Sequence, residues 1–246
     1  MIIGLIPSRL NSKRLKEKPL LNIDGLPIIV HSLKRAQLSK KLDKIFVCTD
    51  HKKIVDVVKK NNGQAIMTSK KHRNGTERIY EVAKKIKKAK FLIDIQGDQP
   101  LISPEAIDAT VDFHKKNKQF DIVLPSMPIN GDADNKSLVK TIFSEDGRII
   151  YFSREKTPYN YSSKKIKYYK NLSIISFTPQ ALKKFYKAKM GKLEKTEGIE
   201  LMRALEIGLS IGTFVIKGSD FAVDVNADLL KAINLMPKDK YRKFYK

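Results

Sequence analysis

The sequence is poor in the residues that build cross-linked or metal-rich proteins. It has one cysteine (Cys48), four histidines and no tryptophan among 246 residues. A single cysteine excludes an internal disulfide framework and fits a reducing compartment, so we expect a cytoplasmic protein. So few histidine and cysteine ligands also argue against a zinc site. No apolar run is long enough to cross a bilayer, and we expect no membrane insertion.

Acidic residues are scarce relative to basic ones. Asp and Glu number 26 against 49 Lys and Arg, which gives a formal net charge of +23. Such an excess invites a nucleic-acid partner. Most of the cations, however, are lysines, many of them in doublets spread along the chain, as at 40–41, 59–60 and 183–184. A dedicated nucleic-acid surface concentrates arginine and aromatic residues. We therefore favour a protein that binds a small anionic substrate over a basic nucleic-acid-binding protein.

Short apolar runs alternate with helix-like segments through the first half of the chain. The runs typical of buried strands are MIIGLI, KIFVCTD, QAIMTS, FLIDIQGD and DIVLPSMPI. This alternation predicts an α/β fold with a mostly parallel, Rossmann-like sheet and helices on both faces. Such sheets bind ligands at the carboxyl ends of their strands. The polar segments to inspect are therefore 7–18, 48–50, 68–78 and 96–100.

The later part of the chain has a different pattern. An Asp146-Gly147 pair between two apolar runs predicts a hairpin, and we expect an antiparallel insertion at about 130–178 within a single domain over 1–246. This insertion is rich in tyrosine and is a candidate dimer interface. The segment 194–208 is expected to form one helix, and 221–225 a strand.

The first strand leads into a loop with five cations in ten residues, from Arg9 to Lys18. Arginine forks fit phosphate oxygens, and a lysine can neutralise charge that develops at phosphorus. The loop has neither the G-x-x-x-x-G-K-[ST] nor the G-x-G-x-x-G pattern. Charge alone favours a solvated basic loop over an anion-binding one.

Two carboxylates are candidate magnesium ligands. Asp98 lies in IQGDQP, directly after an apolar strand, where Gly97 permits close approach of a ligand. Asp224 lies between two valines in FAVDV, an unusual position for a carboxylate. The alternatives are an Asp98 that caps the turn before Pro100 and an Asp224 that faces solvent or caps the next helix.

Two further segments carry polar patterns. In RNGTER, residues 73–78, the start of a helix offers free backbone N–H groups for an anion or a base edge, and Arg78 could reach a carboxylate. The alternative is that Thr76 is an ordinary N-cap. Three glutamates, Glu194, Glu197 and Glu200, recur every third residue and would form one stripe on a helix. The stripe suits either pairing with Arg203 or hydrogen bonds to sugar hydroxyls.

Taken in order, the segments IPSRLNSKRLKEKPL, HRNGTERIYEVA, IDIQGDQPLI, IYFSREKTP, GKLEKTEGIELMRALEIG and VDVNADL resemble those of the 3-deoxy-manno-octulosonate cytidylyltransferases, or CMP-Kdo synthetases. The match spans nearly the whole chain. Lys18-Pro19 favours this branch over the related sialic-acid branch, which usually has Lys-Asn there. The resemblance implies attack of a 3-deoxy-2-ulosonic acid on the α-phosphorus of CTP with loss of pyrophosphate, for lipopolysaccharide or capsule synthesis, and a homodimer.

The resemblance also implies roles for individual residues. The triphosphate would contact Arg9, Ser12, Arg14 and Lys18, of which Arg14 and Lys18, with Asp98, would be catalytic. Asn74 and Gly75 would lie near the cytosine, and Asp98 and Asp224 would hold Mg²⁺. The residues facing the sugar acid would be Arg78, Gln96, Arg154, Glu197 and Glu200. Lys13 and Lys16 fall at variable positions and are expected to be solvated.

The expected sugar pocket departs from the family pattern. Asn171, Ser173 and Leu201 stand where the family usually has His, Gly and Gln. Lost hydrogen-bonding groups alter selectivity, so the substrate is expected to be Kdo or a variant of it. The alternatives are a sialic-acid-like substrate, a nucleotidyltransferase for another nucleotide or a sugar phosphate, and a catalytically dead homologue. The retained Arg9, Lys18, Asp98 and Asp224 argue against the last.

Overall fold

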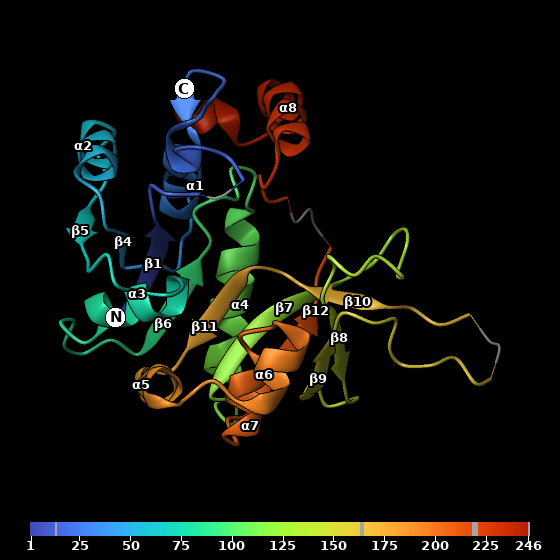
Figure 1. Ribbon diagram of the computed structural model, residues 1–246. Helices are drawn as coiled ribbons and strands as arrows, with labels where there is room; N and C mark the ends of the chain where they lie inside the picture. The colour runs from blue at the N-terminus through green and yellow to red at the C-terminus, as the bar shows by residue number, and fades with distance from the viewer. Residues whose placement is uncertain (13, 163–164, 218–220, 246) are drawn as a thin grey trace. The chain divides into compact units, whose positions relative to one another are not determined.

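The computed structural model describes residues 1–12, 14–162, 165–217 and 221–245 (Figure 1). Two compact units share the chain: Met1–Ala109 with Ser219–Lys246, called unit 1, and Thr110–Gly218, called unit 2. Each unit is described by itself. The boundaries of a single domain with an insertion stay a prediction. In the part of the chain that the structure describes, no helix is both long and apolar enough to span a membrane.

Unit 1 is built on four parallel strands in the spatial order β5 (Ala65–Met67), β4 (Lys44–Thr49), β1 (Ile2–Ser8) and β6 (Phe91–Ile95). Every residue of β1 is buried, which explains why its sequence is an uninterrupted apolar run. The helices are α1 (Ile28–Gln37), α2 (Lys52–Lys60), α3 (Gly75–Ala83), α8 (Asn226–Leu235) and the start of α4 (Pro104–Lys116). A short hairpin joins β2 (Asn22–Ile23) and β3 (Leu26–Pro27). The fold class predicted from the alternating pattern is confirmed.

Short 3₁₀ turns complete unit 1: η1 (Lys18–Leu20), η2 (Met236–Lys238) and η3 (Arg242–Tyr245). An apolar cluster ties the first of these to the C-terminal segment. It contains Leu15, Ile23, Ile28, Leu101, Val223, Ala232 and Met236. The loop after β1 and the segment around residue 224 therefore share one core, although about 200 residues separate them in the chain.

Unit 2 contains most of the antiparallel structure. Its strand β7 (Ile122–Pro128) pairs antiparallel with β10 (Tyr169–Asn171) and β11 (Ile174–Phe177), and parallel with β12 (Ile211–Val215). The strands β8 (Lys140–Phe143) and β9 (Ile149–Ser153) form the expected hairpin. At its turn, Gly147 has φ of +81°, and a Cβ there would lie 2.7 Å from the Thr213 carbonyl oxygen, so the position requires glycine.

Two of the expected elements are wrong. The helix predicted over 194–208 is broken into α6 (Lys192–Glu197) and α7 (Met202–Glu206), because Gly198 takes the left-handed conformation at φ +62° and ends α6. The predicted strand 221–225 is absent, and residues 221–224 are irregular chain that leads into α8. The remaining helix of unit 2 is α5 (Pro179–Lys187), which Thr178 caps through its hydroxyl oxygen.

Candidate active site

A cavity of about 450 Å³ opens in unit 1 where β1 and β6 end. Its position agrees with the general rule that parallel sheets bind ligands at the carboxyl ends of their strands. Four segments of chain line it, and they contain Arg9, Ser12, Arg14, Lys18, Asn74, Gly75, Arg78, Gln96, Asp98 and Asp224. The structure thus brings together all the predicted site residues of unit 1.

Lys18 is the centre of the charged groups in this pocket. Its Nζ donates to Oδ2 of Asp98 at 2.7 Å and to Oδ1 of Asp224 at 3.2 Å. Nη2 of Arg14 donates to the same Asp224 oxygen at 2.7 Å. The lysine side chain is 14% exposed and that of Arg14 is 62% exposed, so the two cations differ in freedom to move. Lys16 is exposed as expected, and Lys13 lies outside the described residues.

Local hydrogen bonds fix the position of Lys18. The hydroxyl of Ser12 accepts from the Leu15 amide at 3.4 Å, and the Leu15 carbonyl accepts from the Lys18 amide at 3.2 Å. Leu15 is buried in the apolar cluster, while Pro19 occupies the first turn of η1. The sequence Leu-Lys-Glu-Lys-Pro therefore forms a compact turn, in which the buried leucine and the proline determine where the ammonium group lies.

Backbone contacts place the two carboxylates together. The Val223 amide donates to the Asp98 carbonyl at 2.9 Å, and the Val223 side chain is fully buried. Asp228 accepts from the amides of Asp224 and Val225 at 2.9 and 3.0 Å, which fixes the chain at the start of α8. The Asp224 side chain is 39% exposed, yet its carboxylate is paired with Arg14 and Lys18, and the Asp98 carboxylate also contacts Lys18.

The donor set suits a hard divalent cation. Asp98 and Asp224 already converge on one ammonium group, and carboxylate oxygens are the ligands that Mg²⁺ prefers, together with phosphate oxygens of a substrate. Within the described ranges, no group of three or more His, Cys, Asp or Glu side chains could hold a metal ion. A cation at these two aspartates would therefore take its further oxygen ligands from substrate or water.

Gly97 lines the pocket, as a residue that permits close approach of a ligand should, and it also has a packing role. A Cβ at this position would lie 2.8 Å from the Pro7 carbonyl oxygen and 3.0 Å from Cδ1 of Ile29. The glycine is therefore required for the close packing of the chain after β6 on the end of β1 and on α1. Gln96, beside it, lines the pocket and donates from Nε2 to both carboxylate oxygens of Asp94 at 3.1 Å.

The segment 69–74, of which residues 72–74 line the pocket, is held by two glutamates of α3. Glu81 accepts from the Ser69 amide at 2.9 Å and contacts Nε2 of His72 at 2.6 Å. Glu77 accepts from the backbone and side chain of Arg73. The Ser69 amide, together with His72, keeps the pKa of Glu81 below its usual value, against the opposing effect of burial. The segment is thus preorganised by charge-assisted hydrogen bonds.

The start of α3 faces the same pocket. Asn74, rather than Thr76, is its N-cap, and its Oδ1 accepts from the Glu77 amide at 2.9 Å. Asn74 and Gly75 line the cavity beside the helix N-terminus, where amides and the helix dipole favour an electronegative group. Arg78 reaches a carboxylate as expected. Its Nη2 donates to Asp50 at 2.9 Å, and its Nη1 donates to the Thr68 hydroxyl at 2.6 Å.

Sequence reasoning missed several of these partners. Asp50, Glu81 and His72 were not singled out, although each either lines the pocket or orients a residue that does. A signal existed for Asp50, because it follows a strand at the same sheet edge. For His72 and Glu81 the spacing of nine residues joins a loop to a helix, and no helical or strand periodicity relates them.

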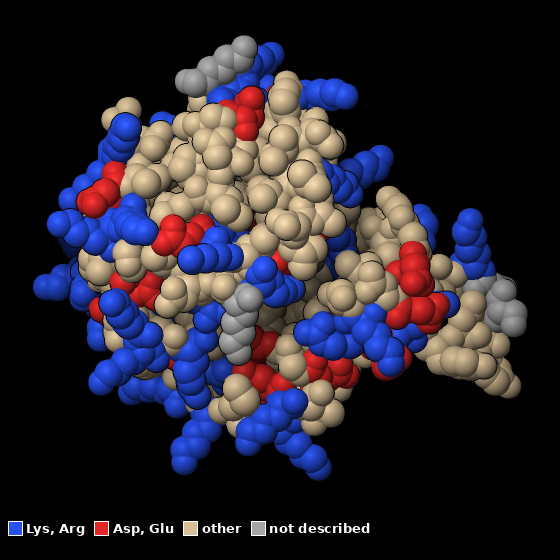
Figure 2. All heavy atoms as spheres, turned by 45° about the horizontal axis from the view of Figure 1, so that its top comes forward, with Lys and Arg blue, Asp and Glu red and all other residues tan. Residues whose placement is uncertain are grey.

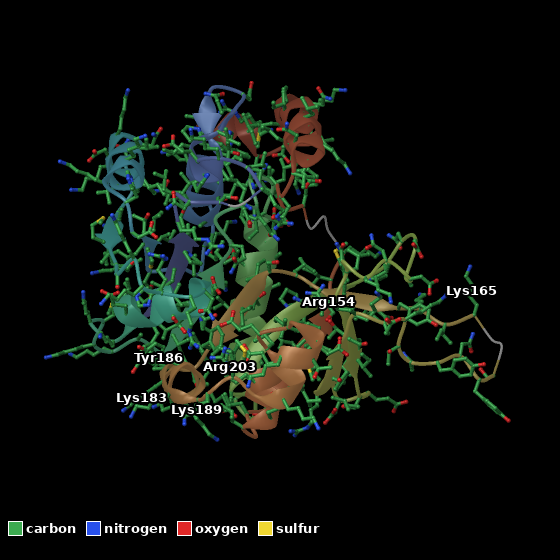
Figure 3. The ribbon with its side chains drawn as sticks, in the orientation of Figure 1. Arg154, Lys165, Lys183, Tyr186, Lys189 and Arg203 are labelled. Carbon is green, nitrogen blue, oxygen red and sulfur yellow. The ribbon has the colours of Figure 1, made fainter. Side chains whose placement is uncertain are left out.

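The other predicted substrate contacts lie in unit 2 (Figure 3). The Arg154 amide donates to Oε2 of Glu197 at 3.0 Å, and its Nε donates to the Glu197 carbonyl at 2.8 Å. The glutamates do not form one helical stripe, because the helix is broken. Glu194 instead makes a buried, bidentate pair with Arg203 at 2.6 and 2.5 Å. The pairing interpretation holds for Glu194, and Glu200 lies between the two short helices.

The chain is similar to known cytidylyltransferases over most of its length. A sequence profile of the cytidylyltransferases matches residues 3–211. A 3-deoxy-manno-octulosonate cytidylyltransferase of Thermodesulfovibrio yellowstonii is 35% identical over 92% of this chain and 94% of its own. An 8-amino-3,8-dideoxy-manno-octulosonate cytidylyltransferase of Shewanella putrefaciens is 34% identical over 94% of this chain and 96% of its own.

A solved structure of a CMP:2-keto-3-deoxy-manno-octonic acid synthetase complexed with CTP has a TM-score of 0.93 and 30% identity, and covers 96% of this chain and 98% of its own. A glucose-1-phosphate thymidylyltransferase described as putative, from Bacillus anthracis, has a TM-score of 0.68 at 15% identity and shows the shared fold alone. The fold and the site define a nucleotidyltransferase. The chain belongs to the cytidylyltransferase family, among its 3-deoxy-manno-octulosonate cytidylyltransferases.

Proposed function

We propose that this protein couples CTP to a 3-deoxy-2-ulosonic acid, Kdo or a close variant of it, and releases pyrophosphate. The observation that carries the proposal is the convergence of Asp98 and Asp224 on Lys18 in the pocket where β1 and β6 end. Two carboxylates and several cations in one cavity suit a nucleoside triphosphate with its metal ion, because phosphoryl-type transfer depends on alignment and charge neutralisation.

In the proposed reaction the anomeric hydroxyl oxygen of the sugar acid forms a bond to the α-phosphorus of CTP. The bond from that phosphorus to the bridging oxygen of the β-phosphate breaks, pyrophosphate leaves with the electron pair, and the hydroxyl proton is released. Arg9, Arg14 and Lys18 bind the triphosphate, and the N-terminus of α3 at Asn74 and Gly75 lies near the cytosine. Lys18 exchanges its carboxylate partners for phosphate oxygens and neutralises charge at the α-phosphate.

Asp98 and Asp224 are the residues that would hold Mg²⁺. The ion would polarise phosphate oxygens and screen their charge against an anionic nucleophile. With CTP and Mg²⁺ present, the carboxylates are no longer needed as partners of Lys18 and Arg14. The salt bridges of the free enzyme would thus be replaced, with substrate bound, by a metal site at the aspartates and a phosphate site at the lysine and arginine.

The sugar acid is expected to contact Arg78, Gln96, Arg154, Glu197 and Glu200. Asn171, Ser173 and Leu201 replace usual family residues, and the aliphatic Leu201 side chain, which is 8% exposed, has no hydrogen-bonding group. Relatives named for Kdo and for its 8-amino variant are about equally similar to this chain. We propose Kdo or such a variant as substrate, for lipopolysaccharide or capsule synthesis, by a cytoplasmic homodimer. A sialic-acid-like substrate is the alternative.

The direct test measures pyrophosphate release from CTP and Mg²⁺ with Kdo, its 8-amino variant and a sialic acid. We expect release with one of the first two, and rates at least about tenfold lower with UTP or ATP in place of CTP. The Asp98→Asn variant is the control for background hydrolysis. Release with none of the sugar acids would contradict the proposal, and affinity for duplex DNA that is insensitive to CTP would favour the nucleic-acid alternative.

A further inference from the structure

One surface of unit 2 has positive charge without compensating acidic groups. It is formed by α5, α6 and the segment between them, and we call it the α5–α6 basic surface. Its six lysines are all exposed: Lys183, Lys184, Lys187, Lys189, Lys192 and Lys195. Figure 3 labels Lys183 and Tyr186 on α5 and Lys189 just after its end. Within the described ranges, none of the six forms an ion pair.

The acidic residues nearest this surface are engaged with other groups. Glu194 is 5% exposed and pairs with Arg203. Glu197 is half-buried and accepts from the Arg154 amide. Glu206 of α7 is exposed, and its carboxylate accepts from the Leu193 amide at 2.8 Å; a Cβ on Gly191 would lie 2.0 Å from it, so this glycine is what lets the carboxylate cap α6. These carboxylates are therefore committed to partners other than the six lysines.

Some lysines elsewhere in the chain are ion-paired, as in Lys53–Glu17 at 2.8 Å, Lys136–Glu155 at 2.7 Å and Lys156–Asp134 at 2.9 Å. Others, such as Lys52, Lys59 and Lys60 of α2, are exposed and have no such partner within the described ranges. Lys and Arg side chains are also spread over the face shown in Figure 2. The α2 lysines therefore match the α5–α6 basic surface in unneutralised charge, and the exposed apolar side chains among its lysines set that surface apart from α2.

Exposed apolar side chains are interleaved with these lysines. Tyr186, Met190 and Leu193 are 39%, 42% and 37% exposed. On α5, Lys183, Tyr186 and Lys187 are spaced by three and four residues and share one face, whereas Leu182 and Phe185 are buried on the other. Exposed apolar groups ringed by lysine amines and a tyrosine are typical of surfaces that rest on an anionic bilayer, where the tyrosine lies at headgroup depth.

We propose that the α5–α6 basic surface docks reversibly on anionic lipid headgroups. The surface contains no arginine that is free for phosphate forks and one tyrosine for stacking, since Arg203 is committed to Glu194. That composition favours a lipid surface over a nucleic acid. Docking would release the sugar nucleotide product close to a membrane, where an enzyme that transfers the sugar to a lipid-linked acceptor would consume it.

The test is co-sedimentation of the full chain with vesicles of phosphatidylglycerol and phosphatidylethanolamine, with phosphatidylcholine vesicles for comparison. We expect binding to the anionic vesicles at about 50 mM NaCl and release at about 300 mM. The triple variant Lys183→Gln, Lys187→Gln, Lys189→Gln should lower the partition coefficient at least about tenfold. Met190→Ser should lower it with the salt dependence unchanged.

The matched control removes the same charge from α2, by Lys52→Gln, Lys59→Gln and Lys60→Gln, at three exposed positions of unit 1. This control should change vesicle binding by less than about threefold, and both triple variants should keep the turnover of CTP in solution. Equal losses in the two triple variants would mean that diffuse net charge causes binding and would overturn the proposal. Absence of binding at low salt, or tighter binding to a duplex of about 20 base pairs, would overturn it as well.

Discussion

At the scale of single residues, the two lysines of the loop after β1 have opposite environments. Lys18 is 14% exposed and contacts both pocket aspartates, whereas Lys16 is exposed and lies outside the pocket lining. We expect Lys18→Ala to lower kcat by about 10²-fold or more, because it removes the charge that we propose neutralises the reacting phosphate. Lys16→Ala should change kcat less than about twofold. Steady-state pyrophosphate release measures both.

A circular dichroism spectrum and the melting temperature of Lys18→Ala separate lost chemistry from lost structure. In Lys18→Ala, Asp98 and Asp224 would face each other without their shared cation. The double variant Lys18→Met, Asp224→Asn leaves only one carboxylate there and is therefore a second control for folding. Equal losses of turnover in Lys16→Ala and Lys18→Ala would show that the loop acts as a diffuse charge patch.

Residue-level predictions succeeded where local sequence determines position. Asp98 follows a buried strand and Asn74 precedes a helix, so both could be placed at the sheet edge from the sequence. Asp224 could be named but was assigned to a strand, because the alternation Val-Asp-Val has a strand-like period. Its true position depends on the Asp98 carbonyl and the Asp228 side chain, and the first of these is a contact that no local pattern encodes.

At the scale of elements, α6 and α7 are joined by the buried Glu194–Arg203 pair, whose side chains are 6% and 2% exposed. Arg203→Met should destabilise the protein by about 3–5 kcal/mol, because it leaves a buried carboxylate without its partner. The exposed pair Lys136–Glu155, at 71% and 69% exposure, provides the matched control. Lys136→Met should shift the unfolding midpoint far less than Arg203→Met does, because solvent screens this exposed pair. Urea unfolding followed by circular dichroism gives both values.

Rescue by a second substitution distinguishes lost pairing from lost packing. Glu194→Leu together with Arg203→Met should recover much of the stability, since no unpaired charge remains. A double variant as unstable as Arg203→Met alone would mean that the packing of Arg203 against the Phe185 ring, at 4.7 Å from its centroid, dominates instead. The Glu194–Arg203 pair also explains why the predicted single helix is wrong. For these two side chains to meet, the chain has to turn between them, and it does so at Gly198.

At the scale of the whole molecule, two buried histidines predict acid sensitivity. His31 and His114 are both fully buried. Burial lowers the pKa of His31 from 6.5 to about 4 and lowers the pKa of His114 as well. Nε2 of His31 contacts the Ile23 carbonyl at 2.7 Å, so this nitrogen carries the proton, and Nδ1 accepts from the Tyr245 hydroxyl at 3.3 Å. The folded state therefore requires neutral rings.

Below pH 6.5 the unfolded chain binds protons at these histidines that the folded chain does not, so the free energy of unfolding falls as the pH drops towards about 4. The stabilisation is complete above pH 6.5, and the loss from His31 alone reaches about 3 kcal/mol. Urea titrations at pH 7.5, 6.0 and 5.0 measure it. His31→Gln should flatten this part of the curve, and an unchanged slope in that variant would assign the sensitivity to other groups.

Unit 1 is assembled from two pieces of chain that are separated by the whole of unit 2. The earlier piece supplies Arg9, Lys18 and Asp98, and the later piece supplies Asp224 with Val223 and Met236 of the shared core. On the ribosome, a nascent chain that has emerged only as far as residue 217 lacks the second carboxylate and also lacks Val223, Ala232 and Met236 of the apolar cluster around Leu15. Synthesis itself therefore delays assembly of the pocket, and a partly made chain is expected to be unable to sequester CTP.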